Sequence, residues 1–271
     1  MSGRIENRAI VTIAIGRAFQ EMAKCTHPLM QEYAARCNAR FLPIVQPRFE
    51  SFGSGRHTYE KFQLFDLLTQ YDRIAFIDND ILVQRNAPNL FEIVPPGTLG
   101  AVAEEEFDQV PIHKRITQEE LGAIDWTRPY FNAGMMVLSR SHKPLFDPHY
   151  PGIKRWATDE VRTKYGLIGN DQPYFNYRVN QMDLPFMDLG YRFNHTRVMH
   201  PPHHRFRSYL IHGTGPCGHR YGPRLWQIQM DARIIDNPFF LSLSSRFPAY
   251  RWAIDRCHPG FFKWLKRKWF D

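Results

Sequence analysis

The first part of the chain alternates short apolar runs with segments of helical period, and this alternation limits the fold more than any other feature. Residues 9–16, 40–45 and 73–77 are β-rich apolar runs of strand length. Residues 59–70 carry apolar side chains at helical spacing. Strands that alternate with helices predict an α/β fold with a mostly parallel sheet, whose ligand site lies at the carboxyl ends of its strands.

The rest of the chain adds further predicted elements. A helix is expected over residues 29–37, with Thr26 and Pro28 forming its N-terminal cap and first turn. The remaining elements are strands over 98–105 and 131–139 and a helix over 170–181 that begins after Asn170. With no linker visible, residues 1–223 are expected to form one catalytic domain, followed by a helical extension over 224–271.

The acidic triplet Asp78-Asn79-Asp80 directly follows the apolar run 73–77. Buried carboxylates are costly unless a partner compensates for their lost hydration. Two carboxylates at positions i and i+2 after a strand can chelate one hard cation, and Mg²⁺ or Mn²⁺ prefers such oxygen ligands. The alternative is a solvated loop, because short acidic triplets are also common at strand ends.

Charge and cysteine content limit the choice of partners and compartment. The net charge is +8, and the basic and aromatic residues of 261–270 alternate, as in segments that lie on anionic membranes. No base-reading motif accompanies them, so nucleic acid is not an expected partner. The four cysteines lack CxxC spacing, the N-terminus lacks the features of a secretion signal, and no apolar stretch is long enough to span a bilayer. We therefore expect a cytoplasmic protein with peripheral membrane contact.

Four segments occur in an order that resembles one enzyme family. They are YEKFQLFDLLTQYDRIAFIDNDILV, FNAGMMVLS, NDQPYFN and IHGTG. In this order they resemble the glycosyltransferases of family 8, the group that contains glycogenin and bacterial lipopolysaccharide galactosyltransferases. The resemblance covers about residues 8–216 and implies a GT-A fold, a nucleotide-sugar donor (UDP-sugar by family habit), Mn²⁺ or Mg²⁺, and transfer with retention to a glycan or lipid-linked acceptor.

The resemblance also implies roles for individual residues. Asp78, Asp80 and His212 match the family's metal ligands. The residues matched to donor binding are Ala14, Lys61, Asn79, Ala133, Gly134 and Gly215, together with the three metal ligands. The residues matched to the reacting centre are Asn132, Asp171 and Gln172.

The chain departs from the family pattern in ways that leave the donor base open. The family's histidine motif usually continues with Lys-Pro-Trp, whereas PCGHR follows here, so Arg220 or Arg224 would have to replace the lysine. The first strand also lacks the acidic residue that often reads uracil, so GDP remains an alternative to UDP.

The acidic triplet is also compatible with two other classes of protein. In a haloacid-dehalogenase-like phosphatase the first aspartate would be a nucleophile, but Leu82 stands where that family favours Thr or Val, and the downstream Gly-Asp motif is missing. A catalytically silent sugar-binding or nucleotide-binding scaffold would be expected to have lost a metal ligand, and none is lost. If the transfer inverted configuration, Asp171 would be the first choice of general base.

Overall fold

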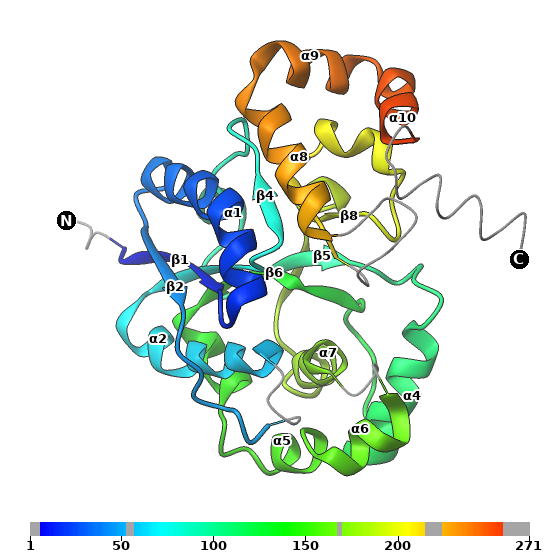
Figure 1. The fold of residues 1–271 in the computed structure, drawn as a ribbon. Helices are drawn as coiled ribbons and strands as arrows, with labels where there is room; N and C mark the ends of the chain where they lie inside the picture. Colours follow the sequence, from blue (N-terminus) through cyan, green and yellow to red (C-terminus); the bar gives the residue numbers. More distant parts are fainter. Residues whose placement is uncertain (1–5, 53–56, 167–169, 215–223, 257–271) are drawn as a thin grey trace, which may run out of the picture. The chain divides into compact units, whose positions relative to one another are not determined.

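The structure is a computed structural model that describes residues 6–52, 57–166, 170–214 and 224–256 (Figure 1). The chain divides into two compact units. Unit 1 comprises residues 1–15, 34–78 and 89–190, and unit 2 comprises residues 16–33, 79–88 and 191–271. Residues 224–256, the described part of the predicted helical extension, are grouped with 191–214 in unit 2.

Unit 1 is built on a six-stranded sheet of order β2-β1-β3-β6-β5-β7. Its strands are β1 (Arg8–Ile13), β2 (Arg40–Ile44), β3 (Arg73–Ile77), β5 (Leu99–Ala103), β6 (Phe131–Ser139) and β7 (Phe186–Asp188). β1 pairs in parallel with β2 and β3, and β5 pairs in parallel with β7. β6 is antiparallel to both β3 and β5. The predicted α/β fold with a mostly parallel sheet is confirmed.

The direction of β6 determines where side chains can meet. Ile77 at the end of β3 pairs with Met135, and Ala103 at the end of β5 pairs with Phe131. The carboxyl ends of β3 and β5 therefore lie beside the beginning of β6. Residues that follow β3 and β5 come close to Asn132 and its neighbours for this reason.

The helices of unit 1 are short. They are η1 (His57–Gln63), α2 (Leu64–Gln70), α3 (Leu90–Ile93), α4 (Val110–Leu121), η2 (Arg140–Phe146), α5 (Pro151–Trp156), α6 (Asp159–Tyr165) and α7 (Asp171–Gln181). The helix expected over 59–70 is a 3₁₀ turn followed by an α-helix. α7 begins as expected, because the Asn170 side chain accepts a hydrogen bond from the Gln172 N–H at 3.0 Å.

One side chain of α7 fixes that helix to the start of β6. Asn176 accepts a hydrogen bond from the Phe131 N–H at 2.7 Å and donates one to the Phe131 carbonyl at 2.8 Å. The amide thus satisfies both backbone groups of one strand residue. It holds the amino end of α7 in a set position relative to Asn132.

Unit 2 contains a small sheet of order β4-β9-β8 and several helices (Figure 1). The strands are β4 (Ile81–Val83), β8 (His195–Thr196) and β9 (Leu210–His212). The helices are α1 (Arg17–Arg36), of which 17–33 belong to this unit, η4 (Tyr191–Phe193), η5 (Pro202–Arg207), α8 (Arg224–Asp236), α9 (Pro238–Arg246) and α10 (Pro248–Arg256). Met22, Leu29, Leu82, Ile211 and Ile228 are part of its apolar core.

The expected start of the first helix was wrong. α1 begins at Arg17 and contains Pro28 in its interior, and Thr26 donates its hydroxyl to the Met22 carbonyl inside the helix instead of capping it. An interior proline removes one helical hydrogen bond, at a cost of about 3 kcal/mol. Burial of Met22 and Leu29 in the core of unit 2 offsets that cost.

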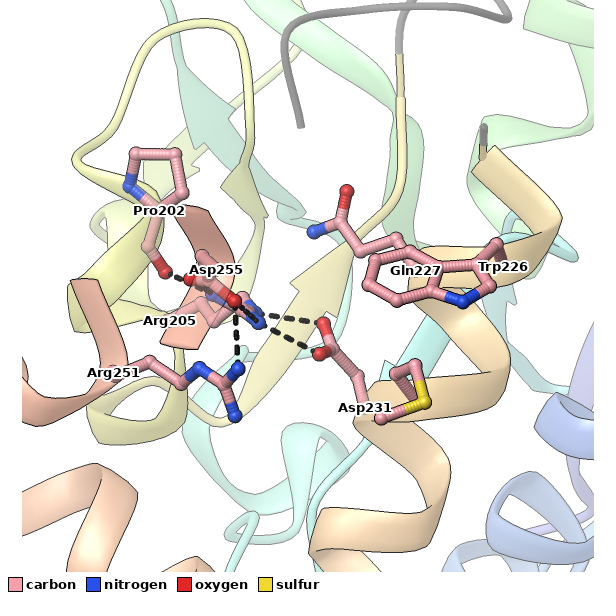
Figure 2. A pocket seen from close by; sticks show the side chains of 8 residues that line it. Pro202, Arg205, Trp226, Gln227, Asp231, Arg251 and Asp255 are labelled. Carbon is pink, nitrogen blue, oxygen red and sulfur yellow. Dashed lines mark hydrogen bonds and ion pairs between the residues drawn. The ribbon is translucent and has the colours of Figure 1, made fainter. Parts of the chain in front are cut away.

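A buried charge cluster joins three helices of unit 2 (Figure 2). Arg205 of η5 donates to both carboxylate oxygens of Asp231 on α8, at 2.7 and 2.8 Å, and to both of Asp255 on α10, at 2.7 and 3.0 Å. Burial alone would lower the pKa of Arg205, but the two carboxylates outweigh it and raise the pKa. The cavity beside the cluster is about 10 Å³, room for one water at most, so the cluster holds helices together and is not a ligand site.

Across the described helices, no segment combines the length and the apolar character that crossing a bilayer requires.

Candidate active site

Asp78 follows β3 and is held by the backbone of β6. Its N–H donates to the Gly134 carbonyl at 2.7 Å, and its side chain keeps 31% of its surface exposed. An apolar strand that runs straight into a carboxylate at the sheet edge is the arrangement expected from the sequence. The Gly134 carbonyl thus fixes the backbone of Asp78, and the carboxylate stays partly exposed at the edge of the sheet.

Lys61 connects two of the predicted site residues. Its ammonium lies 2.6 Å from Asp171 Oδ2 and 3.7 Å from Asp78 Oδ1, and also sits over the Phe76 ring at 5.1 Å. Lys61 and Asp171 are almost fully buried. A buried charge needs such a partner, so unit 1 places one cation between the carboxylate that ends β3 and the carboxylate that begins α7.

The beginning of β6 carries the other predicted residues of unit 1. Gln172 of α7 accepts a hydrogen bond from the Ala133 N–H at 3.2 Å, and Asn132 accepts one from the Gly134 N–H at 2.9 Å. The segment 132–134 is therefore fixed by side chains on both sides. Unit 1 brings together all the predicted residues of 61, 78, 132–134 and 171–172.

Glu104 was not predicted as a site residue, yet it is buried beside Asn132. The Asn132 amide donates to Glu104 Oε1 at 3.0 Å, and Glu104 is 4% exposed. Tyr130 lies next to it, and burial raises the pKa of the Tyr130 phenol well above its usual value. The signal for Glu104 was a carboxylate at the end of a buried strand, as for Asp78, but Glu104 is the first of three consecutive glutamates and lay inside the strand predicted over 98–105.

Unit 2 pairs Asp80 with His212. Asp80 precedes β4, His212 ends β9, and the antiparallel pairing of these strands brings His212 Nε2 to 3.2 Å from Asp80 Oδ1. His212 Nδ1 lies 2.7 Å from Asn194 Oδ1. Burial would raise the pKa of Asp80, but the His212 ring and the nearby Arg224 guanidinium outweigh it and lower the pKa to about 2. Asp80 is therefore ionised at neutral pH.

The chemistry of this pair fits a divalent cation. Asn194 Oδ1 can only accept, so His212 Nδ1 carries a hydrogen, and when the ring is neutral Nε2 is an acceptor that faces the Asp80 carboxylate. Two facing acceptors need a proton or a cation between them. Neighbouring ligands of one octahedral Mg²⁺ lie about 3 Å apart, close to the observed separation. Asp78 stands two residues before Asp80 in the chain and completes a set of two carboxylates and one imidazole.

Asn79, between the two aspartates, is directed into α1. Its amide donates to the Phe19 carbonyl at 2.7 Å, and its Oδ1 lies 2.8 Å from His27 Nε2. The side chain is 3% exposed. The predicted donor contact of Asn79 would therefore involve its backbone, while its side chain anchors the turn that carries Asp80.

Further contacts surround the Asp80–His212 pair. Arg224 at the start of α8 lies 3.4 Å from Asp80 Oδ2. The Gly213 N–H donates to the Asp80 carbonyl at 2.9 Å, and a Cβ at Gly213 would come within 3.3 Å of that oxygen. Arg197 donates to the Thr214 carbonyl at 2.6 Å. Sequence reasoning offered Arg224 as one alternative, but missed Asn194 and Arg197, which no spacing rule connects to His212.

The remaining predicted positions are less informative. Ala14 is buried just after β1, and its N–H donates to the Ile44 carbonyl at 2.8 Å. Gly215 and Arg220 lie outside the described residues, as does the basic and aromatic segment 261–270.

Comparisons with known proteins agree with this architecture. Residues 26–142 match the model of "Glycosyl transferase family 8". A glycosyltransferase "involved in the glycosylation of the major capsid of PBCV-1" is similar in structure, with 14% identity, a TM-score of 0.50, and coverage of 83% of this chain and 99% of that one. The galactosyltransferase LgtC, solved with donor and acceptor sugar analogues, has 13% identity, a TM-score of 0.51, and coverage of 84% and 95%. No curated protein matches the sequence.

The fold and the family match together support one class of enzyme, a glycosyltransferase with the GT-A fold. Within that class, the chain is similar to glycosyl transferase family 8 over residues 26–142. Two of the four sequence segments lie within this match, and the resemblance inferred from the sequence is confirmed over residues 26–142.

Proposed function

We propose that the protein is a metal-dependent glycosyltransferase that moves a sugar from a nucleoside diphosphate sugar to an acceptor hydroxyl. The observation that carries the proposal is the pairing of Asp80 with His212 at 3.2 Å, two residues after Asp78. Phosphate oxygens and these side chains are suitable ligands for one Mn²⁺ or Mg²⁺. A silent scaffold would have no need of a buried, ionised carboxylate that faces an imidazole ring.

The residues of the site have separate tasks in this proposal. Asp78, Asp80 and His212 would hold the cation, which neutralises the charge that develops on the departing diphosphate. Asn194 sets the ring orientation of His212. Arg224, 3.4 Å from Asp80, places a further positive charge beside the ligand set and would take the place of the family's lysine.

Unit 1 would bind the sugar and orient the acceptor. The segment 132–134, fixed by Gln172 and Glu104, offers amide groups to sugar hydroxyls. Asp171 is ion-paired with Lys61 at 2.6 Å, which suits a fixed negative charge near the anomeric carbon better than a proton acceptor. We therefore favour transfer with retention, in which the leaving diphosphate accepts the acceptor's proton.

The remaining details of the proposal rest on the sequence. UDP is the first choice of nucleotide, and the acceptor is a glycan or a lipid-linked sugar in polysaccharide biosynthesis. The protein would act in the cytoplasm, with the basic and aromatic segment 261–270 contacting anionic lipid.

The test is a thermal-shift screen of UDP, GDP, CDP and their common sugars, each with Mn²⁺ or with EDTA. A ligand at 100 times its Kd stabilises the native state by about 2.7 kcal/mol, which raises the melting temperature. We expect a shift for one nucleotide that requires the metal. A nucleotide shift that is the same in EDTA would contradict the metal site.

Two variants connect the shift to the site. Asp80→Asn and His212→Gln should abolish both the metal-dependent shift and sugar transfer while the far-UV circular dichroism stays unchanged. Asp236→Asn, an exposed aspartate paired with Arg85, is the matched control and should behave like the wild type. A metal-dependent shift without transfer to any acceptor would instead favour the silent scaffold.

A further inference from the structure

Helix α9 (Pro238–Arg246) leaves two phenylalanines exposed to solvent, while Leu241 packs against the core of unit 2 and a serine is buried. Phe239 is 70% exposed and Phe240 45%, whereas Ser244 is 2% exposed. Among the described residues, the Ser244 hydroxyl has no hydrogen-bond partner. A surface helix normally buries its large apolar side chains. Two exposed phenylalanines on a helix that also buries a serine indicate that something else covers the outward side.

The exposed apolar side chains continue past α9. Phe247, the residue after α9, is 57% exposed, and Trp252 of α10 is 45% exposed. We call Phe239, Phe240, Phe247 and Trp252 the aromatic face. Of the eight large apolar side chains that are exposed in the described part of the chain, these four lie within residues 239–252. Single exposed apolar residues need no explanation, but a concentration of aromatics marks an interaction surface.

The spacing along α9 makes one stripe of this surface. Phe240 and Leu243 are three residues apart, so they lie on one side of the helix, and Phe247 follows directly after its last residue. Arg246 follows on the neighbouring turn and is exposed. A helix with Phe and Leu on one side and arginine at its border has the composition of segments that lie in a lipid headgroup layer.

The charge of the chain favours lipid over a second copy as the occupant. Each chain carries a net charge of +8, so two copies repel each other while an anionic surface attracts either one. In addition, the sequence that follows α10 contains Lys263, Lys266, Arg267 and Lys268. We propose that the aromatic face docks on an anionic lipid surface, with Phe239 and Phe240 entering the headgroup layer and Arg246 pairing with lipid phosphate.

The proposal is independent of the donor site, and it is separate from the contact assigned to 261–270. The full chain is mixed with vesicles of phosphatidylcholine alone or with phosphatidylglycerol, and the bound fraction is measured by flotation. The variant Phe239→Ser/Phe240→Ser keeps the segment 261–270. Ile112→Ser is the matched control, because Ile112 is 41% exposed on α4 in unit 1.

We expect the affinity of the double variant for anionic vesicles to be lower than that of the wild type by about tenfold or more. The reason is that the variant no longer transfers two aromatic rings from water into the headgroup layer. Ile112→Ser should bind like the wild type. Arg246→Gln should weaken binding to anionic vesicles and leave binding to neutral ones unchanged. The melting temperature and the metal-dependent nucleotide shift should stay the same in all three variants, so a failure here is distinguishable from a failure of the proposed function.

Unchanged vesicle binding by the double variant would overturn the proposal. So would a wild-type dimer in analytical ultracentrifugation that the double variant converts to a monomer, because the aromatic face would then bind a second copy. Loss of vesicle binding by Ile112→Ser as well would show a non-specific effect and also overturn it.

Discussion

At the scale of single residues, the side chain between the two aspartates determines where the second one points. Asn79 uses both ends of its amide on α1, with the Phe19 carbonyl at 2.7 Å and His27 Nε2 at 2.8 Å. Burial lowers the pKa of His27, so the neutral ring donates to the Asn79 oxygen. The position of Asp80, the next residue, is therefore fixed by α1 as well as by β4.

Asn79→Ala should weaken metal binding although residue 79 is not itself a metal ligand. The change removes the hydrogen bonds of the Asn79 amide to the Phe19 carbonyl and the His27 ring, at a cost of about 0.5–1.5 kcal/mol each, and loosens the turn before Asp80. We expect an apparent Mn²⁺ affinity about tenfold lower, measured by titrating Mn²⁺ against the nucleotide-dependent thermal shift.

The control is a second asparagine with a purely structural task. Asn89 caps α3 by accepting a hydrogen bond from the Phe91 N–H at 3.1 Å, and Asn89→Ala should cost about 1 kcal/mol of stability without changing Mn²⁺ affinity. His27→Gln can still donate to Asn79 and should retain most of the affinity. Equal losses in Asn79→Ala and Asn89→Ala would show that only stability had changed.

At the scale of elements, the Arg205 cluster decides whether α8 and α10 stay together. Both helices present a carboxylate to the same guanidinium (Figure 2), and Asp231 is 1% exposed. The sharing of one cation by two helices makes their positions interdependent. Because α8 begins with Arg224, which faces Asp80, this packing also bears on the candidate metal site.

Arg205→Met should destabilise unit 2 strongly. It leaves Asp231 buried and unpaired and leaves Asp255 with Arg251 alone, at 2.9 Å, for a loss of about 3–5 kcal/mol in the free energy of unfolding. Urea denaturation measures it.

Arg115→Met is the comparison, since Arg115 forms an exposed i,i+4 pair with Glu119. It should change stability by less than about 1 kcal/mol. If the two substitutions cost the same, the cluster contributes no more than a surface pair. Replacing Arg205 and Asp231 together by Met and Leu should recover part of the loss, because no unpaired charge is then left between η5 and α8.

At the scale of the whole molecule, buried histidines make stability depend on pH. Burial lowers the pKa of His113 and His142 to about 4 and that of His195 to about 3. The unfolded chain binds a proton at each near pH 6.5, whereas the folded chain does not. Their contribution is therefore complete above about pH 6.5 and is lost as the pH falls towards 4.

The free energy of unfolding should fall steadily between pH 6.5 and 4.5, by on the order of 1 kcal/mol per histidine per pH unit. Urea denaturation at several pH values measures the slope. His142→Gln keeps an acceptor for the Ser139 N–H, which His142 Nδ1 accepts at 2.8 Å, and should reduce the slope. A stability that is constant over this range would show that the histidines are protonated in the folded state.

Some elements could be predicted because their local and global signals agree. β3, β6 and α7 lie at the residues expected, and each is either an uninterrupted apolar run or a helix with a clear N-cap. α1 could not be placed, because Pro28 has the local signature of a first turn and only the packing of Met22 and Leu29 shows that it lies inside the helix. At Pro28, the packing of the helix against the core outweighs the local preference of proline for a first turn.

The residues of the candidate site also divide into those that the sequence could identify and those that it could not. Asp78 and Asp80 carried their own chemical signal, and His212, Lys61 and Asp171 followed from the resemblance. Asn194 could not be found, because it reaches His212 only through the parallel pairing of β8 with β9, and no sequence pattern announces a pair of strands that short. Nothing in the sequence distinguishes Glu104 from other surface carboxylates, because its contact with Asn132 depends on the position of β6.

The Asn79–His27 contact has a consequence for how relatives evolve. A pattern written D-x-D treats its middle position as free, yet here that position forms hydrogen bonds to a ring fifty-two residues earlier. We expect positions 27 and 79 to change together among homologues, asparagine accompanying a donor at 27 and a small apolar residue accompanying its loss. Independent variation of the two columns in a deep alignment would argue against this coupling. Where the pair is kept, we expect fewer substitutions around Phe19 than in the rest of α1. The helix would then vary with the site although none of its side chains takes part in the chemistry.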